Sequence, residues 1–381
     1  MPEAYIVDAV RTPVGRRGGT LSEIHPTDLG AHVLKEIVVR SRVDASAVDD
    51  VIFGCVDQIG AQSFNVARGA WLAAGLPESV PGTTVDRQCG SSLQALHFAA
   101  QAVMSGAMDL VVAGGVEVMS LVPIFSSSDV GREQGLGDPF GGIGFRARYQ
   151  GEISQFRGAQ LMVERWGIER EEMERFALTS HQRAAQAWDD GRFTTEVSPV
   201  GGLDRDEGIR RDTTLEKMAQ LSPLAGYPAL TAAIASQISD GAAALMVASE
   251  AAVARHGLTP RARVHAMAVV GSDPQLMLTG PIPATSAVLE RGGLALGDID
   301  VFEVNEAFAP VVLAWSRETG ASLERTNVNG GAIALGHPLG ATGAKLTTTL
   351  LHELERRKGR YGLVAICEGG GTANATIIER L

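Results

Sequence analysis

The chain has 381 residues, 45% of them hydrophobic, so it is long enough to bury a large core and to fold as two or three lobes. Its formal net charge of −11 argues against nucleic acid or an anionic membrane as the main partner. Three cysteines favour free thiols in a reducing compartment over a disulfide framework. No secretory signal pattern and no apolar run of membrane-spanning length are evident, so we expect a soluble cytoplasmic protein.

The first 119 residues alternate predicted strands with predicted helices. Short apolar runs predict the strands, and apolar spacing with cap residues predicts the helices, the first of them with Thr27 or Asp28 near its cap. Glycines are expected to end the second and third helices. The predicted strands are 4–10, 48–54 and 110–115, and the predicted helices are 28–40, 65–74 and 93–105.

This alternation stops near residue 120 and resumes near residue 262. The middle segment contains glycine- and serine-rich loops, a charged helical stretch at 167–188 and a mixed acidic and basic stretch at 203–218. Such a change of character predicts an inserted segment between two α/β parts.

The two α/β parts correspond to each other in sequence, which indicates an internal duplication. Four pairs of segments follow in the same order at a nearly constant offset: 4–10 with 262–270, 48–54 with 299–305, 83–92 with 327–340, and 110–115 with 363–371. We therefore predict one half formed by 1–119 plus 240–261, an inserted loop domain at 120–239, and a second half at 262–381.

The duplication places four residues at equivalent ends of extended segments. Cys89 falls opposite His337, while Asn305 and Cys367 each follow a predicted strand. Loops at the carboxyl ends of parallel strands meet on one side of a sheet, so these four side chains are expected to converge.

His337 lies within 327–345, NVNGGAIALGHPLGATGAK, which contains five glycines. Pro338 disfavours helical geometry at His337, and the segment that follows predicts a helix of small residues. An isolated histidine is more often structural than functional. Its position in a glycine-rich turn before a helix makes His337 the candidate base.

Cys89 precedes a predicted helix, where unpaired N–H groups favour a thiolate, and Gly90 allows close approach of a ligand. The alternative is a buried and inert cysteine. Cys367 ends an apolar strand before three glycines, so it is a candidate second acid/base, although such cysteines usually only pack. Asn305 either positions a water or caps a helix. Cys55 is assigned a structural role.

Two thiols, one imidazole and several glycine turns fit carbon–carbon bond chemistry on thioesters better than simple hydrolysis. That chemistry requires a nucleophile, a base and two oxyanion sites. A cysteine hydrolase would leave Cys367 unused. No Cys or His pair has metal-ligand spacing, so no metal is expected. No dinucleotide-binding or phosphate-binding glycine motif follows a predicted strand.

Four motifs together resemble those of the thiolase family, of the 3-ketoacyl-CoA thiolase (acetyl-CoA acyltransferase) type. They extend over essentially the whole chain and are DRQCGSSLQA at 86–95, NEAFA at 305–309, the glycine-rich segment at 327–345, and CEGGG at 367–371. The resemblance implies an α/β thiolase fold: a duplicated, five-layered αβαβα core with an inserted loop domain that binds coenzyme A. It also implies a homodimer or homotetramer.

By this resemblance, Cys89 is acylated, His337 activates it, and Cys367 exchanges the α-proton. Asn305 would hold a water that forms one oxyanion hole with His337, and the N–H groups of Cys89 and Gly369 would form the other. The implied activity is cleavage of 3-ketoacyl-CoA by coenzyme A to acetyl-CoA or propionyl-CoA and a shortened acyl-CoA. Coenzyme A is then a co-substrate, and no cofactor is tightly bound.

The coenzyme A contacts implied for the inserted segment are Ser236, Arg210 and Lys217. The two basic residues would supply the positive patch that phosphates need in an acidic protein, but they fit solvated surface charges equally well.

The chain departs from short-chain acetoacetyl-CoA thiolases at Ser92, at Glu368 and at 151–156, where those enzymes carry a Met-Gly pair. The departures suggest a roomier acyl pocket, as in thiolases for long or bulky acyl chains including sterol side chains. Biosynthetic condensation would use the same residues. A carrier of acyl-CoA or lipid without turnover would need neither cysteine nor the histidine.

Overall fold

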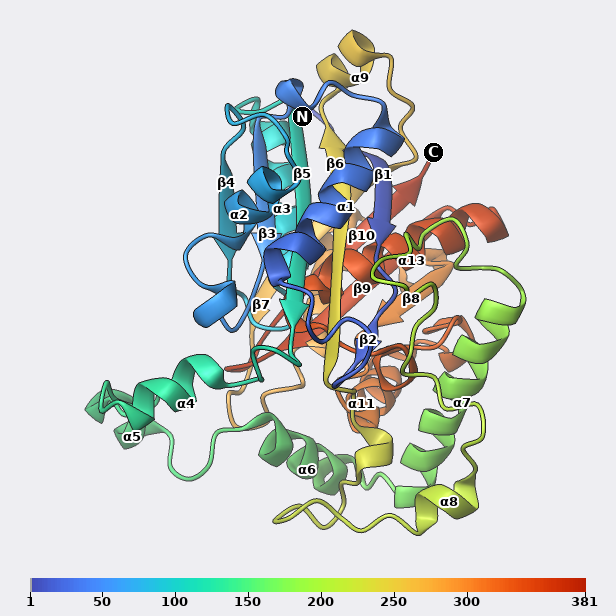
Figure 1. The fold of residues 1–381 in the computed structure, drawn as a ribbon. Helices are drawn as coiled ribbons and strands as arrows, with labels where there is room; N and C mark the ends of the chain where they lie inside the picture. The colour runs from blue at the N-terminus through green and yellow to red at the C-terminus, as the bar shows by residue number, and fades with distance from the viewer. Residues whose placement is uncertain (1) are drawn as a thin grey trace.

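The computed structural model describes residues 2–381 (Figure 1); Met1, with which the predicted first half begins, lies outside the described residues. The strands are β1 (Tyr5–Arg11), β2 (Gly15–Arg16), β3 (Asp50–Gly54), β4 (Gly82–Val85), β5 (Leu110–Val118), β6 (Ser239–Ala248), β7 (Ala262–Gly271), β8 (Val301–Val304), β9 (Tyr361–Glu368) and β10 (Thr372–Arg380). The helices are α1 (Pro26–Ser41), α2 (Val66–Ala73), α3 (Ser91–Ser105), α4 (Ser126–Glu133), α5 (Ile143–Arg148), α6 (Gln155–Trp166), α7 (Arg170–Asp189), α8 (Leu215–Ala219), α9 (Glu250–His256), α10 (Pro281–Gly292), α11 (Ala309–Thr319), α12 (Ala332–Leu335) and α13 (Thr342–Arg357).

The strands are ordered β4-β3-β5-β6-β1-β7-β10-β9-β8, and β2 pairs with β6. Only two residue pairs, Tyr5–Arg263 and Ile6–Ala262, join β1 to β7, so the ladder divides there into two sheets. The first sheet has the order β3-β5-β6-β1 and the second the equivalent order β8-β9-β10-β7. Thr326 bridges Phe302 of β8 in parallel, as β4 pairs with β3. The duplication predicted from the sequence is therefore present in the topology.

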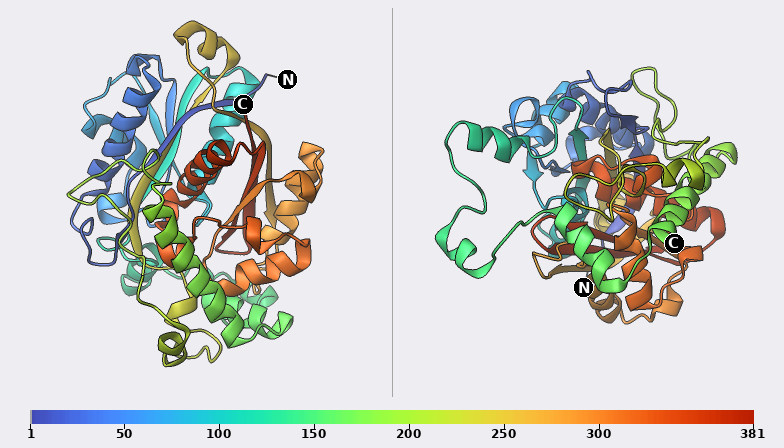
Figure 2. Two further views of the ribbon diagram at one scale, coloured as in Figure 1. Left: turned by 90° about the vertical axis from the view of Figure 1, so that its right-hand side faces the viewer. Right: turned by 90° about the horizontal axis from the view of Figure 1, so that it is seen from below.

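Helices α3 and α13 lie between the two sheets and complete five layers (Figure 2). One hydrophobic cluster joins these helices to the inner faces of both sheets, through residues that include Leu93, Leu96, Val111, Leu245, Leu350, Leu354, Val364 and Ile366. A second cluster packs α1 and α2 on the outside of the first sheet, and a third packs α10 and α11 on the outside of the second. The predicted αβαβα fold is confirmed.

Strand alternation decides which β9 side chains face the central helices. Val364 and Ile366 belong to the central cluster, while Leu363 and Ala365 belong to the outer one. Glu368 continues the series that faces α3. Cys367 lies on the other face and packs in a cluster that contains Phe308 and Met277.

Most of the segment between β5 and β6 packs beneath the second sheet. Met162 of α6 and Ala177 of α7 share a hydrophobic cluster with Leu313 of α11. Helices α4 and α5, in contrast, extend away from the sheets (Figures 1 and 2). None of the helices within residues 2–381 is both long enough and apolar enough to cross a membrane.

A buried ion triad connects the first sheet to the inserted segment. Arg11 at the end of β1 donates to Glu196 at 2.6 Å and to Asp206 at 2.8 Å, and all three side chains are almost fully buried. Because one guanidinium pairs with both carboxylates, the triad holds the loop 196–206 at both of its ends.

The helix boundaries differ from the sequence prediction mainly at their starts. Helix α1 is capped by His25, whose ring accepts from the Thr27 amide at 3.3 Å, rather than by Thr27 or Asp28. Helix α3 begins at Ser91, two residues before the predicted start. In both cases the turn preceding the apolar run already has the hydrogen bonds of the helix.

Candidate active site

Cys89 lies in a tight turn that leads from β4 into α3. Gln88, directly before it, has a φ of 49°, a conformation that is uncommon for a residue with a side chain. The Ser91 hydroxyl donates to the Gln88 carbonyl at 2.6 Å and accepts from the Arg87 amide at 2.9 Å. Gly90 is the N-cap of α3. The predicted position of Cys89 at a helix start is observed, in a turn held by its own side chains.

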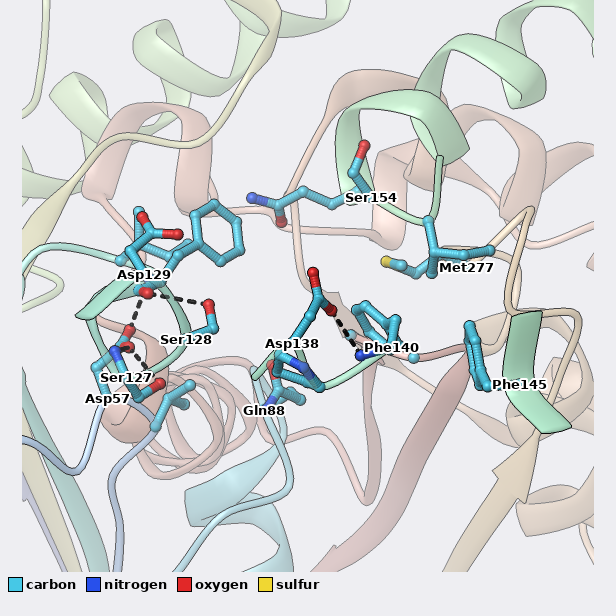
Figure 3. A pocket seen from close by; sticks show the side chains of 18 of the residues that line it. Asp57, Gln88, Ser127, Ser128, Asp129, Asp138, Phe140, Phe145, Ser154 and Met277 are labelled. Atoms are coloured by element: carbon cyan, nitrogen blue, oxygen red, sulfur yellow. Dashed lines mark hydrogen bonds between the residues drawn. The ribbon is translucent and has the colours of Figure 1, made fainter. Parts of the chain in front are cut away.

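A cavity of about 1130 Å³ opens over Cys89. Gly369 and Gly370 from the turn after β9, and Leu339 from the turn after His337, line the same cavity as Cys89. Phe140, Phe145 and Met277 lie along one side, and the α4 residues 127–129 lie opposite (Figure 3). The cavity is therefore walled by both halves and by the projecting segment.

His337 is buried, and its hydrogen bonds define its tautomer. Its Nδ1 lies 2.6 Å from the Thr342 hydroxyl, which donates its own hydrogen to the Pro338 carbonyl at 2.8 Å. The hydroxyl has only one hydrogen, so it accepts from Nδ1–H, and the lone pair of the ring is on Nε2. Burial lowers the pKa of His337 to about 3, and the Lys345 ammonium adds to the shift. His337 is therefore a neutral imidazole with its free lone pair on Nε2.

Asn305 at the end of β8 contacts this lone pair. Its Nδ2 lies 3.3 Å from His337 Nε2, while its Oδ1 is buried without a hydrogen-bond partner among the described residues. Helix α11 is capped at Phe308 and receives no side-chain cap, so the helix-cap alternative for Asn305 is wrong. The unpartnered amide oxygen can accept a hydrogen bond from a ligand or a water.

The Cys89 and His337 turns pack directly on each other at the starts of α3 and α13. Ser92 Oγ accepts from the Ala344 amide at 2.9 Å. A side chain on Gly343 would collide with the backbone of Leu93, so only glycine allows this approach. The structure thus brings together the two turns that the sequence repeat made equivalent.

Cys367 adjoins both the cavity and Cys89. Only Glu368 separates it from the cavity-lining Gly369 and Gly370, and its charge, when ionised, raises the pKa of Cys89. Burial raises the pKa of Cys367 itself to about 12, with Glu368 adding to the rise. The amides of Cys89 and Gly369 donate no hydrogen bond to another residue within 2–381, so both are free to bind an oxyanion.

The Cys89 thiol is less acidic than its place at a helix start predicts. Burial raises its pKa well above the ordinary value, and the charges of Cys367 and Glu368 raise it further. Here the loss of hydration raises the pKa of the thiol more than the helix N-terminus lowers it, because the helix end stabilises the thiolate less than water would. The thiol therefore requires a base.

The three predicted coenzyme A contacts do not line the cavity over Cys89. Ser236 donates its amide to the Ala307 carbonyl at 2.9 Å, close to the β8 end that carries Asn305. Arg210 is exposed, and its amide donates to His181 Nδ1 at 3.1 Å. Lys217 is exposed and paired with Asp212 at 2.8 Å.

Two of the sequence departures also lie outside the cavity. Ser92 joins α3 to α13, and Glu368 lies beneath Gly90, so neither residue enlarges the acyl pocket. The third departure does lie there, because Gly151 and Ile153–Gln155 line the cavity. The prediction of an altered pocket was therefore wrong for Ser92 and Glu368, whose side chains point into packed regions between the halves.

Sequence reasoning missed two residues that hold the His337 turn. Thr342 fixes the ring, and Glu117 at the end of β5 accepts from the Gly340 amide at 2.8 Å and the Val56 amide at 2.9 Å. A glutamate within the otherwise apolar strand 110–118, at the strand end nearest the site, was the available signal. A metal-binding group of three or more His, Cys, Asp or Glu side chains is not found within residues 2–381.

Comparison with known proteins agrees with this geometry. Residues 4–251 match the family described as "Thiolase, N-terminal domain", and residues 258–380 match "Thiolase, C-terminal domain". The chain belongs to the thiolase family. It is 59% identical to the "Steroid 3-ketoacyl-CoA thiolase FadA6" of Mycobacterium tuberculosis, over 100% of this chain and 95% of that protein. It is 47% identical to the "3-oxoadipyl-CoA/3-oxo-5,6-dehydrosuberyl-CoA thiolase" of Escherichia coli, over the full length of both.

The fold of this thiolase matches solved structures equally well. The human mitochondrial 3-ketoacyl-CoA thiolase, solved in complex with CoA, has a TM-score of 0.90 at 36% identity, over 100% of this chain and 98% of that one. The family, the fold and the expected activity class, a degradative 3-ketoacyl-CoA thiolase that uses coenzyme A as a substrate, are confirmed.

Proposed function

We propose that this thiolase cleaves 3-ketoacyl-CoA esters with bulky acyl groups through an acyl-Cys89 intermediate. The observation that carries the proposal is the packing of two turns on each other: one places the protonated Cys89 thiol in a large cavity, and the other carries His337, a neutral imidazole whose tautomer is fixed by Thr342. A protonated thiol is a weak nucleophile. The lone pair of the imidazole can take the proton of the thiol and so make the sulfur nucleophilic.

In the first half-reaction, the Cys89 thiol gives its proton to the His337 imidazole and the sulfur attacks the 3-keto carbon. The bond between C2 and C3 then breaks, and its electrons pass to C2, which takes the proton of the Cys367 thiol and leaves as acetyl-CoA or propionyl-CoA. The new oxyanion forms on the carbon bonded to the Cys89 sulfur, so we assign it to the amides of Cys89 and Gly369. We assign the thioester carbonyl of the leaving part to His337 and to a water held by Asn305.

In the second half-reaction, coenzyme A loses its thiol proton to the Cys367 thiolate and attacks the acyl-Cys89 carbonyl. The carbon–sulfur bond to Cys89 breaks, and the Cys89 sulfur regains a proton from His337. Both cysteines and the histidine return to their starting states, so the residues serve one full turnover. The same steps in reverse would condense two acyl-CoA molecules.

The cavity supports a bulky acyl group. Its volume exceeds the usual 300–1000 Å³ of a small-molecule site, and Phe140, Phe145 and Met277 give it an apolar side. The relative in Mycobacterium tuberculosis is named for steroid substrates. We therefore expect higher kcat/KM for long-chain or sterol side-chain 3-ketoacyl-CoA than for acetoacetyl-CoA. Equal kcat/KM values for these substrates and for acetoacetyl-CoA would contradict the proposed preference for bulky acyl groups.

Ser236, Arg210 and Lys217 are proposed as the coenzyme A side of the site. Gln237, next to Ser236, donates to the carbonyls of Gly208 and Ile333, which ties the chain just before Arg210 to α12, four residues before His337. Lys217 must exchange Asp212 for a phosphate, so we expect its removal to raise KM for coenzyme A less than removal of Arg210.

The decisive experiment traps the acyl-enzyme by mass spectrometry after mixing with a 3-ketoacyl-CoA. We expect the adduct in wild type, none in Cys89→Ala, and an adduct without completed thiolysis in Cys367→Ala. Cys55→Ala is the matched control, because Cys55 is also a buried free cysteine but does not line the cavity. Full turnover in Cys367→Ala would contradict its role. Acyl-CoA binding without any adduct would instead indicate a carrier.

Three further assignments are proposed with this function. The units 1–119 plus 240–261, 120–239 and 262–381 follow the division of the strands. A reducing cytoplasmic location is consistent with the three free cysteines. A homodimer or homotetramer is supported by the projecting segment, where Leu136 is 79% and Ile143 is 90% exposed. Light scattering that gives a monomer mass would contradict the last assignment.

A further inference from the structure

Glu368 is a buried acid that the catalytic steps do not use. It is the last residue of β9 and faces the start of α3, on the strand face opposite to that of Cys367. Its Oε2 accepts from the Thr372 hydroxyl at 2.6 Å, but its Oε1 has no hydrogen-bond partner among the described residues. That free oxygen lies directly beneath Gly90: a side chain on Gly90 would collide with it.

Asn374 of β10 presents a second free oxygen at the same place. Its Nδ2 donates to the Gly90 carbonyl at 3.0 Å, and its Oδ1 is buried without a partner within the described chain. A Cβ placed on Gly90 would lie 2.8 Å from this Oδ1 as well as against Glu368 Oε1. Two acceptor oxygens therefore point at one spot below the Cys89 turn, and neither has a donor.

Turning the amide of Asn374 around does not remove the conflict. Its oxygen would then face the Gly90 carbonyl, and a carbonyl carries no proton to donate. A carboxylic acid, in contrast, has an O–H group. The arrangement in which every polar atom is satisfied is the one in which Glu368 is protonated and donates to Asn374, which in turn donates to Gly90.

We propose that Glu368 is a positioning residue that acts as a neutral acid, bracing the Cys89 turn through Asn374, and that its ionisation makes Cys89 less reactive. The inference rests on Cys89 being the nucleophile of the proposed function. Glu368 touches no substrate; it acts through the backbone of Gly90 and through its charge.

The surroundings of Glu368 agree with a neutral acid in the resting enzyme. Burial raises its pKa to about 7, against the opposing effects of the Thr372 hydroxyl and Arg87, and Asp86 raises it further. The Nε of Arg87 is buried without an acceptor in the described structure, so it does not donate to Glu368. The other titratable groups nearby are Cys89 and Cys367, which an ionised Glu368 disfavours as thiolates, and His97 on α3, which burial keeps neutral.

The test measures the rate of Cys89 alkylation by iodoacetamide against pH, read by mass spectrometry, in wild type, Glu368→Gln and Thr372→Val. Glutamine keeps the shape and can donate to Asn374, but it cannot ionise. We expect the ratio of Glu368→Gln to wild type to rise about tenfold between about pH 6 and about pH 8, which is the effect of one pKa unit on Cys89. Thr372→Val removes the donor that favours the carboxylate, so the wild-type inflection should move to higher pH.

Difference infrared spectroscopy supplies an independent readout. We expect the wild-type spectrum minus that of Glu368→Gln to show a protonated-carboxyl band near pH 6. Glu117, whose pKa burial also raises to about 7, is present in both proteins and cancels in this difference. A pH-independent ratio of alkylation rates, or a difference spectrum without the carboxyl band, would overturn the proposal. Neither measurement requires turnover, so failure here is distinguishable from failure of the acyl-enzyme experiment, which would overturn the proposed function instead.

Discussion

The sharpest prediction concerns Thr342, which never contacts substrate in the proposed mechanism. In Thr342→Val the hydroxyl that accepts from His337 Nδ1 at 2.6 Å is replaced by a methyl group of similar size. The buried Nδ1–H of His337 then has no acceptor, or its proton moves to Nε2. In the second case Nε2 no longer has the lone pair that would accept the proton of Cys89. Either outcome costs about 1–3 kcal/mol, the penalty of an unpaired buried polar group. At 1.36 kcal/mol per tenfold, kcat/KM falls by roughly 5- to 150-fold.

The assay follows thiolysis through the disappearance of the 3-ketoacyl-CoA chromophore on addition of coenzyme A. Thr347→Val is the matched control: Thr347 lies on the same helix, is fully buried, and donates to the Gly343 carbonyl at 2.8 Å as Thr342 donates to Pro338. Both variants lose a hydrogen bond of this type, but only Thr342→Val affects the histidine. Thr342→Ser should retain most activity. Equal kcat/KM in Thr342→Val and Thr347→Val would refute the tautomer argument.

Three other outcomes follow from the packing. Arg11→Met leaves Glu196 and Asp206 buried without their cation, so the free energy of unfolding in urea should fall by about 3–5 kcal/mol. A change below about 1 kcal/mol would mean that these ion pairs do not form in solution. Gly90→Ala should reduce kcat/KM at least tenfold, because its Cβ meets Glu368 and Asn374, whereas Gly131→Ala, which meets nothing, should not. Finally, folded Glu368 keeps its proton up to about pH 7 while the unfolded residue loses it near 4.5, so stability should decline by up to about 3 kcal/mol as pH rises through that window. Melting curves of Glu368→Gln should lack this part of the decline.

The fold could be predicted largely from the sequence because its two halves repeat one pattern. Matching strand and turn segments at a constant offset indicated the duplicated topology, and helix ends such as Gly106 were marked by local residues. The direction of α4 and α5 was not predictable, because no periodic apolar stripe specifies what they pack against. The start of α4 depends on a residue distant in sequence, because Asp57 accepts from the Ser127 amide at 3.0 Å.

The site could be predicted as a set of residues but not as an electrostatic state. Cys89, His337 and Cys367 occupy conspicuous turns, and the resemblance assigned them roles. The acidity expected of Cys89 from its helix start was reversed by burial, which depends on what covers the turn in three dimensions. Likewise, the significance of Glu368 arises only when β9, β10 and α3 place its oxygen opposite Asn374 beneath Gly90.

The packing of α3 against α13 has a consequence for the proposed site. Cys89 and His337, the proposed nucleophile and base, each precede one central helix, and Gly343 leaves no space for the starts of these helices to slide past each other. A substitution that shifts one half relative to the other must therefore move Cys89 relative to His337. The contact between the halves thus couples the packing of the core to the geometry of the proposed site.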